Sequence, residues 1–170
     1  MSTQSTTARI LDGNEVSSAI IAEVRKAIDS RVLAGGRRPG LAVVLVGSDP
    51  ASTVYVNAKR RDCERAGILA RDFDLAADTS EEALLDLVDD LNEDPDIDGI
   101  LVQLPLPDHI DTDKVIDAIS PTKDADGFHP VNAGRLSIGL PGFAPCTPAG
   151  IIEMLKRYDI PLRGAHAVVV

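Results

Sequence analysis

The sequence predicts an α/β fold: a three-layer arrangement in which a mostly parallel sheet is flanked by helices. Segments with apolar residues at helical spacing alternate with short apolar runs, which is typical of parallel strands joined by helices. The 170 residues are 44% hydrophobic and 26% charged, so the chain has enough apolar surface for a folded core and is not wholly disordered. Only 3% of the residues are aromatic and the formal net charge is −10, which argues against a nucleic-acid partner.

The first elements follow from apolar spacing and from chain breakers. A short extended stretch is predicted at Ala8–Leu11, and a helix follows because apolar residues from Val16 to Ile28 recur at helical spacing. Glycines and a proline between positions 35 and 40 end this helix. The run LAVVLV at Leu41–Val46 is continuous and apolar, which predicts a strand buried on both faces.

A second helix is predicted directly after this strand. Asp49 can cap its first turn, and Pro50 is tolerated at its first position because that amide has no helical partner. Gly67 is a suitable terminator. The spacing of four residues then places Tyr55 and Lys59 on one face of the helix.

The middle of the chain repeats the alternation. Ile68–Leu75 is predicted to be extended, and Thr79 with Glu82 has the spacing of a capping box before a third amphipathic helix. Ile100–Leu104 is the next predicted buried strand, which ends because the prolines after it lack backbone donors. Gln103 therefore lies at the carboxyl end of this strand.

The last third of the chain is predicted to be less regular. Thr112–Ile119 is a short helix candidate, and Pro121–Pro145 is expected to be mostly loop. Another helix opens at Thr147 and runs toward Lys156 or Arg157, and the apolar residues Ala167–Val170 predict a new strand.

Cysteines, histidines and apolar runs indicate the compartment. The two cysteines, Cys63 and Cys146, are too few for a disulfide scaffold and lack the pairing of a zinc site. The three histidines are scattered, so no metal site is predicted. No apolar run approaches the roughly 18 residues that a membrane span needs. We therefore expect a cytoplasmic protein with free thiols and no membrane partner.

Two local patterns suggest chemistry that the wider sequence does not support. Cys146 lies near a predicted helix start, but no spacing supports His129 or His166 as its partner in a nucleophilic pair, so a small buried thiol is the simpler interpretation. The acidic pattern DPDIDG at 94–99 is similar to the start of a calcium loop. Pro105 stands where the final ligand of that loop would be, which excludes calcium there.

Tyr55 and Lys59 form the most informative local pattern. The same spacing occurs in short-chain dehydrogenases, but those enzymes need a glycine-rich nucleotide loop upstream, and none precedes Tyr55. An ordinary helix surface is the alternative for so short a pattern. Arg60 and Arg61 would disfavour another positive charge beside them, and burial against Tyr55 would act in the same direction. A neutral Lys59 can serve as a general base.

Two further polar features lie where an α/β sheet binds ligands. Gln103 stands at the carboxyl end of a predicted strand, and its amide can donate and accept at once, although a core glutamine satisfied by loop backbone is the alternative. The loop Lys123–Gly127 carries two carboxylates. These can accept paired hydrogen bonds from an aminopyrimidine-like ring, or they can form an Asx turn.

Four ordered segments resemble one known family. They are VGSDPASTVYVNAKRRDCERAGI (46–68), DGILVQLPLP (98–107), PTKDADGFHPVNAGRL (121–136) and PCTPAGIIEML (145–155). From about Leu11 onward, the chain is similar to the bifunctional methylenetetrahydrofolate dehydrogenase/cyclohydrolases. Several motifs in the same order are far more specific than any one of them.

The resemblance implies a role for each candidate residue. Tyr55 would stack against the folate, and Lys59 would be the catalytic lysine. Gln103 would fix that lysine and contact the substrate, and Asp126 would hold the pterin ring. The implied substrate-binding set is Tyr55, Lys59, Val102, Gln103, Leu104 and Asp126, in which Val102 and Leu104 contribute backbone and Lys59, Gln103 and Asp126 are also catalytic.

The implied activity belongs to one-carbon metabolism and purine biosynthesis. NADP would oxidise 5,10-methylenetetrahydrofolate, and the 5,10-methenyl product would be hydrolysed to 10-formyltetrahydrofolate. Lys59 would help water attack the one-carbon bridge, while Gln103 and Asp126 position the substrate. The implied parent enzyme is a cytoplasmic homodimer that acts on tetrahydrofolate derivatives.

The resemblance also implies two domains. Residues 1–160 would form the folate-binding catalytic domain, and residues 161–170 would begin a Rossmann NADP-binding domain whose Gly-Arg-Ser turn and remainder are absent from the sequence. The NADP site is therefore expected to be mostly missing, and a folate-binding fragment without turnover is the alternative. His166 stands where the family more often has lysine.

Overall fold

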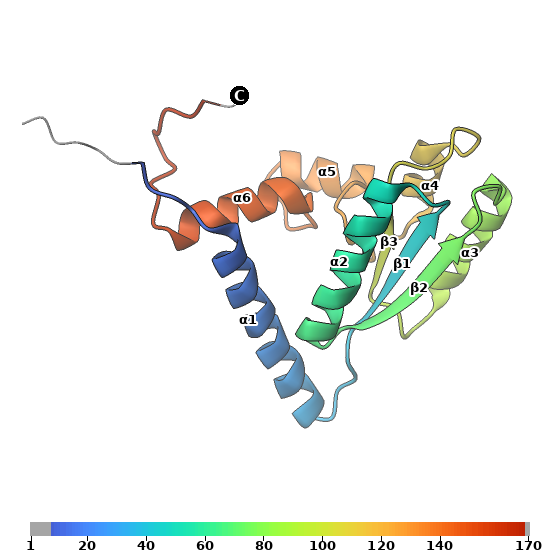
Figure 1. The fold of residues 1–170 in the computed structure, drawn as a ribbon, viewed down its shortest axis with the longest axis horizontal. Coiled ribbons are helices and arrows are strands. Elements are labelled where there is room, and N and C mark those ends of the chain that lie inside the picture. The colour runs from blue at the N-terminus through green and yellow to red at the C-terminus, as the bar shows by residue number, and fades with distance from the viewer. Residues whose placement is uncertain (1–7, 169–170) are drawn as a thin grey trace, which may run out of the picture.

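Three parallel strands form the centre of the fold, in the order β2-β1-β3 (Figure 1). The computed structural model describes residues 8–168. The strands are β1 (Gly40–Val46), β2 (Leu69–Leu75) and β3 (Gly99–Val102). Gly40 is in register with Leu69 on one side of β1, and Leu41 is in register with Gly99 on the other. The predicted α/β class with a parallel sheet is confirmed.

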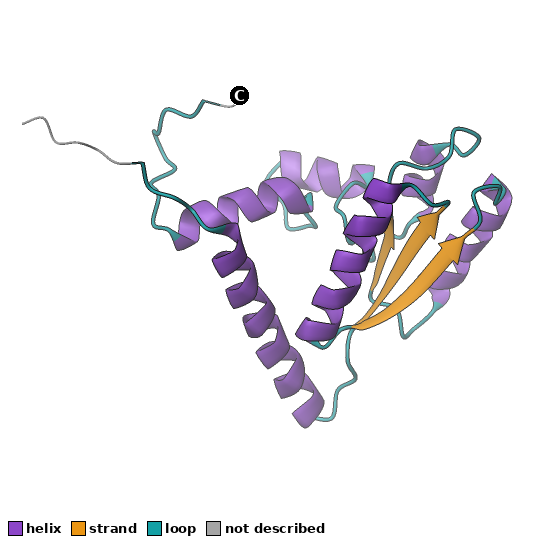
Figure 2. Cartoon of the chain, in the orientation of Figure 1, coloured by secondary structure: helices purple, strands orange, loops and turns teal. Residues whose placement is uncertain are grey.

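Helices cover both faces of this sheet (Figure 2). In the described residues they are α1 (Gly13–Leu33), α2 (Pro50–Ala66), α3 (Glu81–Glu93), α4 (Thr112–Ala118), α5 (Pro130–Ser137) and α6 (Cys146–Arg157). Apolar clusters join α3 and α4 to one face and α2 to the other, while α1 packs against α2 and also contacts α6. Within residues 8–168, none of these helices has the length and apolar character that crossing a membrane requires.

The central strand supplies side chains to both faces because neighbouring residues in a strand point in opposite directions. Val44 lies in one cluster with Leu84 of α3 and Val115 of α4. Its neighbour Val43 packs with Val56 of α2 on the other face. All five side chains are 1% exposed or less. Burial of this aliphatic surface is the main source of stability.

Helix α2 begins and ends at the residues that the sequence indicates. The Asp49 carboxylate accepts a hydrogen bond from the Ser52 amide, and Pro50 occupies the first turn. Gly67 closes the helix with φ +81°, a left-handed conformation that glycine adopts without strain. These ends fix the register of the helix and therefore the direction of its Tyr55 and Lys59 side chains.

The start of α3 differs from the prediction by one residue. Ser80, rather than Thr79, caps the helix, because its hydroxyl accepts a hydrogen bond from the Ala83 amide. The Thr79 carbonyl instead contacts the ring of His109. Adjacent Thr and Ser residues both satisfy the composition of an N-cap, so only the backbone geometry distinguishes them.

Other differences concern short elements. The stretch Pro121–Pro145, predicted to be mostly loop, contains α5, which Pro130 opens and which His129 caps by accepting the Val131 amide at Nδ1. β3 ends at Val102 rather than at Leu104. Ala8–Leu11, predicted to be a short extended stretch, precedes α1 and is not part of the sheet. The strand predicted at Ala167–Val170 is not formed at residues 167 and 168, and its last two residues lie outside the described part.

Candidate functional site

A cleft of about 910 Å³ opens between α1, α2, the carboxyl end of β3 and the start of α6. Five of the six predicted site residues lie in its wall, namely Tyr55, Lys59, Gln103, Leu104 and Asp126. Apolar side chains of α1, including Ile20, Ile21 and Val24, face them. The cleft therefore combines an extended apolar wall with a small polar group, as small-molecule sites commonly do.

Lys59 and Gln103, which are 44 residues apart in the sequence, meet in this cleft. The Lys59 Nζ donates a hydrogen bond to the Gln103 Oε1 at 3.1 Å. The Gln103 Nε2 donates to the Leu104 carbonyl at 2.7 Å, which fixes the orientation of the amide with its oxygen toward the lysine. The Gln103 backbone amide also donates to the Val44 carbonyl at 2.9 Å. Gln103 thus anchors the lysine to the central sheet.

The loop after α4 brings a carboxylate to the same place. Residues 123–125 run along the edge of β3, where the Ile100 amide donates to the Lys123 carbonyl at 2.7 Å and the Ala125 amide donates to the Ile100 carbonyl at 3.2 Å. This short parallel pairing carries Asp126 to the carboxyl end of the sheet, beside the cleft. Ligands bind at this end of open α/β sheets.

The two carboxylates of this loop have different environments. Asp124 is 3% exposed and accepts four hydrogen bonds, from the amides of Gly127, Phe128 and His129 and from the side chain of Asn132, at 2.9–3.2 Å. It forms the Asx-type turn that was one interpretation of this motif. The local pattern alone did not separate its role from that of Asp126, which only the family resemblance assigned to the ligand. The Asp-x-x-Gly spacing before a proline-led helix was the signal that could have done so.

Asp126 is left facing the cleft. Burial raises the pKa of its carboxyl above the ordinary value, the positive charge of Lys59 lowers that pKa in part, and the Asp124 carboxylate raises it. Among the described residues, no side chain or amide donates a hydrogen bond to the Asp126 carboxylate: the Lys59 ammonium donates to Gln103 and the Gly127 amide donates to Asp124. A half-buried carboxylate without a donor is ready to accept hydrogen bonds from a ligand.

Gly127 allows the loop to lie close to the start of α6. Its φ is +71°, and a Cβ at this position would lie 2.6 Å from the Ala144 carbonyl carbon. Beside it, the Cys146 Sγ donates to the Ala125 carbonyl at 3.5 Å. The loop that carries Asp126 is therefore in direct contact with the segment that leads into α6.

Tyr55 and Val102 occupy very different surroundings. Tyr55 lines the cleft with 64% of its surface exposed, so its ring is open to a ligand. Val102 is 6% exposed and packs in the cluster against α3 and α4, away from the wall of the large cleft. Any contact of Val102 with a cleft ligand would therefore have to come from its backbone.

Arg60, which follows Lys59, does not act as predicted. Arg60 forms ion pairs with Asp72 and Asp74 of β2, the latter at 2.6 Å. Its charge is therefore balanced by two carboxylates, and it is not an unopposed positive neighbour of Lys59. Arg61 is solvent-exposed. The partner of Lys59 is Gln103 rather than Tyr55, which does not favour the short-chain dehydrogenase interpretation.

The cysteines differ in exposure. Cys63 is buried, but Cys146 is exposed and lines the cleft, so the prediction of a buried thiol at Cys146 was wrong. Burial of the sulfur atoms raises the pKa of both thiols, which disfavours the nucleophilic thiolate. His129 is used as the cap of α5. Among residues 8–168, no group of three His, Cys, Asp or Glu side chains is arranged to hold a metal ion.

Comparison with solved structures gives close matches along most of the chain. The 5,10-methylenetetrahydrofolate dehydrogenase from the silkworm, Bombyx mori, is 45% identical, with a TM-score of 0.88 over 91% of this chain and 53% of that structure. The bifunctional methylenetetrahydrofolate dehydrogenase/cyclohydrolase from Campylobacter jejuni is 44% identical, with a TM-score of 0.87 over 89% of this chain and 54% of that one. The chain thus spans about half the length of these structures.

A more distant structure has the same fold. The N5,N10-methylenetetrahydrofolate dehydrogenase-cyclohydrolase from Trypanosoma brucei, solved with NADP cofactor and inhibitor, is 36% identical, with a TM-score of 0.87 over 92% of this chain and 54% of that one. The family model for the catalytic domain of tetrahydrofolate dehydrogenase/cyclohydrolase matches residues 11–126, a range that ends at the cleft carboxylate. The resemblance predicted from the four sequence segments is confirmed, and the chain belongs to the tetrahydrofolate dehydrogenase/cyclohydrolase family.

Proposed function

We propose that the cleft binds a tetrahydrofolate derivative and that Lys59 acts in the hydrolysis of 5,10-methenyltetrahydrofolate to 10-formyltetrahydrofolate. The observation that carries the proposal is the contact between the Lys59 Nζ and the Gln103 Oε1 in the same cleft wall as Asp126. The family assignment supports the substrate class, since the matched relatives are named for reactions of methylenetetrahydrofolate.

The cleft has groups that suit each part of a reduced folate. Asp126 can accept hydrogen bonds from the ring nitrogens and amino group of the pterin. The exposed ring of Tyr55 offers a flat surface on which an aromatic part of the ligand can stack. Leu104 and the apolar side chains of α1 enclose the ligand and exclude water. In this proposal, Val102 borders the ligand only through its backbone.

Lys59 is placed to take a proton from the attacking water. The water oxygen bonds to the methenyl carbon and the water loses one proton, which leaves a hydroxyl group on that carbon. The hydroxyl proton then moves to N5 as the bond from the carbon to N5 breaks, which leaves a formyl group on N10. The sum is addition of water and release of one proton. Gln103 accepts one N–H of Lys59, which directs the remaining positions of the amine toward the cleft. The positive charge of the methenyl substrate would itself favour the neutral amine, as a general base requires.

The starts of α2, α3 and α4 do not fit NADP phosphates, and no step is derived through that cofactor. Dinucleotide sites place pyrophosphate against free amides at a helix start. Here the Asp49 carboxylate occupies the start of α2, and the Asp111 carboxylate occupies the start of α4 by accepting two amides. Glu81 and Glu82 lie in the first turn of α3. A pyrophosphate would meet negative charge at each of these three positions.

The remaining parts of the proposal concern an enzyme as long as the matched relatives. For such an enzyme we propose NADP-linked oxidation of 5,10-methylenetetrahydrofolate, a homodimer and a cytoplasmic location. Residues 1–160 would supply the folate site, and residues 161–170 would lead into the NADP-binding domain. The relative from Trypanosoma brucei, which was solved with NADP, supports the cofactor.

Replacing the lysine tests the function. Lys59→Ala should slow hydrolysis of 5,10-methenyltetrahydrofolate by about 10²–10⁴-fold, because a general base contributes that much. Loss of absorbance of the methenyl compound measures the rate, and calorimetry with the stable analogue 5-formyltetrahydrofolate measures binding. Lys156→Ala, which removes an exposed lysine of α6, is the matched control and should leave both unchanged.

Three other outcomes have distinct meanings. Unchanged turnover in Lys59→Ala would refute the role of this lysine. Binding of the analogue by the chain without any turnover would support the alternative of a folate-binding module. Binding of NADP by the chain would contradict the reading of its helix starts and favour an oxidoreductase that uses Tyr55 and Lys59.

A further inference from the structure

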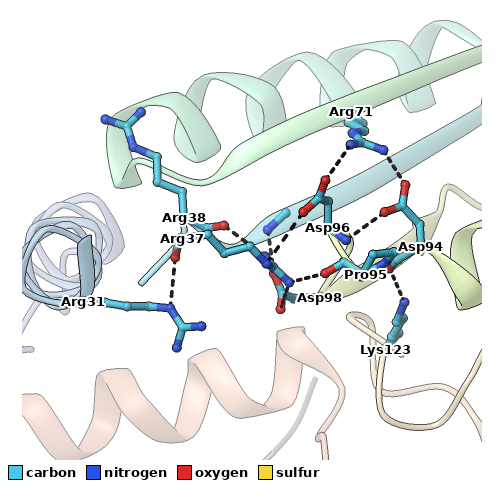
Figure 3. A network of polar contacts seen from close by, with 10 residues as sticks. Arg31, Arg37, Arg38, Arg71, Asp94, Pro95, Asp96, Asp98 and Lys123 are labelled. Carbon is cyan, nitrogen blue, oxygen red and sulfur yellow. Dashed lines mark hydrogen bonds and ion pairs between the residues drawn. The ribbon is translucent and has the colours of Figure 1, made fainter. Parts of the chain in front are cut away.

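Lys123 connects the loop of Asp126 to the far end of α3. Its Nζ donates three hydrogen bonds, to the carbonyls of Leu91, Asn92 and Asp94 at 3.0, 2.7 and 2.8 Å. Figure 3 shows the lysine reaching toward Asp94 from the neighbouring loop. The side chain does not line the cleft, and the proposed chemistry makes no use of it.

The geometry of this contact is that of a helix C-terminus bound by a cation. The last carbonyls of a helix have no intrahelical partner and carry partial negative charge. An ammonium has three donors and no acceptor, so three convergent carbonyls use all of its hydrogen-bonding capacity. Lys123 therefore stabilises the end of α3 and is itself fixed there.

Asp94 and Asn92, whose carbonyls accept the Lys123 hydrogen bonds, make further contacts of their own. The Asp94 carboxylate accepts the Asp96 amide at 2.7 Å and forms an ion pair with Arg71 of β2 (Figure 3). Asn92, whose carbonyl also receives the lysine, accepts the Ser120 amide at 2.8 Å through its side chain. The anchor is thus part of the rigid scaffold rather than of a free loop.

Asp126 follows this anchor and a second one, Asp124, and precedes the amides that Asp124 binds. Lys123 holds the loop toward α3 and β3, because its own carbonyl also receives the Ile100 amide at 2.7 Å. Asp124 holds the other side of the loop toward α5 through its four hydrogen bonds. Ala125, the one residue between Asp124 and Asp126, is itself held because its amide donates to the Ile100 carbonyl at 3.2 Å. The direction of the Asp126 carboxylate therefore depends on both anchors.

We propose that Lys123 is a positioning residue for substrate binding, which acts by holding Asp126 in the cleft through its three bonds to the end of α3. The inference rests on the proposed function, since Asp126 must contact the ligand for its position to matter. Loss of the ammonium would remove a donor from three carbonyls, of which only the Asp94 carbonyl would keep another, the Ile97 amide. The loop would then be free to shift by up to about an ångström, and such shifts weaken binding.

A double-mutant cycle tests the connection. Calorimetry with 5-formyltetrahydrofolate should show that Lys123→Met raises Kd about tenfold, and that Asp126→Asn also raises it. In the Asp126→Asn background, Lys123→Met should add less than about a twofold change, because the residue through which it acts is already disabled. Lys123→Arg, which keeps a cationic donor, should stay within about threefold of the wild type.

The controls separate positioning from unfolding. Lys123→Gln keeps a hydrogen-bond donor and gives a folded second variant if Lys123→Met is too unstable, with an expected rise in Kd of about threefold. Lys156→Met, in which an exposed lysine is replaced, should bind as the wild type does. Thermal unfolding of every variant establishes that the binding temperature lies below its transition.

The possible failures are distinguishable. If Lys123→Met binds normally, or if its effect in the double variant adds fully to that of Asp126→Asn, the positioning role is overturned while the proposed function stands. If Asp126→Asn alone binds as tightly as the wild type, the proposed folate site itself is wrong.

Discussion

The two faces of the sheet serve different purposes. In the described residues, the face toward α3 and α4 has a buried cluster of thirteen apolar residues, whereas the face toward α2 has a cluster of four. The second face instead borders the cleft, where Lys59, Gln103 and Asp126 are only partly buried. One face therefore supplies most of the stability, and the other leaves surface uncovered for a ligand.

The contrast has a physical cause. Apolar burial stabilises in proportion to area, so a closed layer of helices gives the larger gain. A binding cleft needs polar groups that are not yet satisfied, and such groups destabilise the free protein. The three changes that follow test this division, from the largest expected effect to the smallest.

Truncation of the closed face should have the largest effect on stability. Leu84 of α3 is completely buried, so Leu84→Ala should lower the free energy of unfolding by about 2–5 kcal/mol, measured by urea denaturation. Affinity for 5-formyltetrahydrofolate should not change while the variant is folded, because Leu84 lies on the face away from the cleft. Ile20→Ala, a partly buried residue of the cleft wall, is the matched control and should destabilise less. Equal losses from both variants would contradict the division.

A methyl group added at Gly127, in the loop of Asp126, should have an intermediate effect on stability. Gly127→Ala places a Cβ against the Ala144 backbone at a left-handed φ, which should destabilise by roughly 1–3 kcal/mol and weaken ligand binding. Gly134 of α5 has no atom within 4 Å of the equivalent Cβ, so Gly134→Ala should be neutral or stabilising by up to about 1 kcal/mol. Urea denaturation and calorimetry measure the two effects. Similar behaviour of the two variants would show that this loop is not tightly fitted.

Removal of the Asp126 charge should change stability least, and it should stabilise the protein, whereas the two preceding changes destabilise it. Because the folded-state pKa of Asp126 is raised, the folded chain holds this proton more tightly than the unfolded chain. Its contribution to stability is therefore present at low pH and is lost as pH rises from the unfolded pKa through the folded pKa. Asp126→Asn should thus gain about 0.5–1 kcal/mol at neutral pH, and the gain should shrink on acidification. A constant difference from pH 3 to 7 would refute the assigned cause.

The affinity for the ligand should also depend on the protonation of Asp126. Affinity of the wild type for 5-formyltetrahydrofolate should fall on acidification as Asp126 takes up its proton, at a pH above the range of an ordinary aspartate. Asp126→Asn should bind more weakly, without this step in its pH profile. The combination of higher stability and weaker binding would mark Asp126 as a residue kept for function.

Local sequence signals predicted the regular elements well where local interactions decide them. The ends of α2 follow from Asp49, Pro50 and Gly67, whose effects act within one turn of helix. The continuous apolar run of β1 predicted a central strand. Prediction failed where two neighbouring residues were equally suitable, as at Thr79 and Ser80, and where a helix as short as α5 was opened by a proline in a loop-like stretch.

The residues of the site were predicted, but one of the electrostatic effects expected there was not, because it depends on contacts between distant segments. The family motifs identified Tyr55, Lys59, Gln103 and Asp126, and the structure places all four in one cleft wall. The expected influence of Arg60 was wrong because Asp72 and Asp74, which neutralise it, lie on a strand that only folding brings near.

The order of residues by itself determined the α/β class, the ends of α2 and the chemical types available to the site. Tertiary structure alone decided that Asp124 builds the loop through its hydrogen bonds, and that Lys123 holds this loop to the end of α3. The reason is that secondary structure depends on neighbours within a few residues, whereas burial, charge and hydrogen-bond partners depend on segments that meet only in the folded chain.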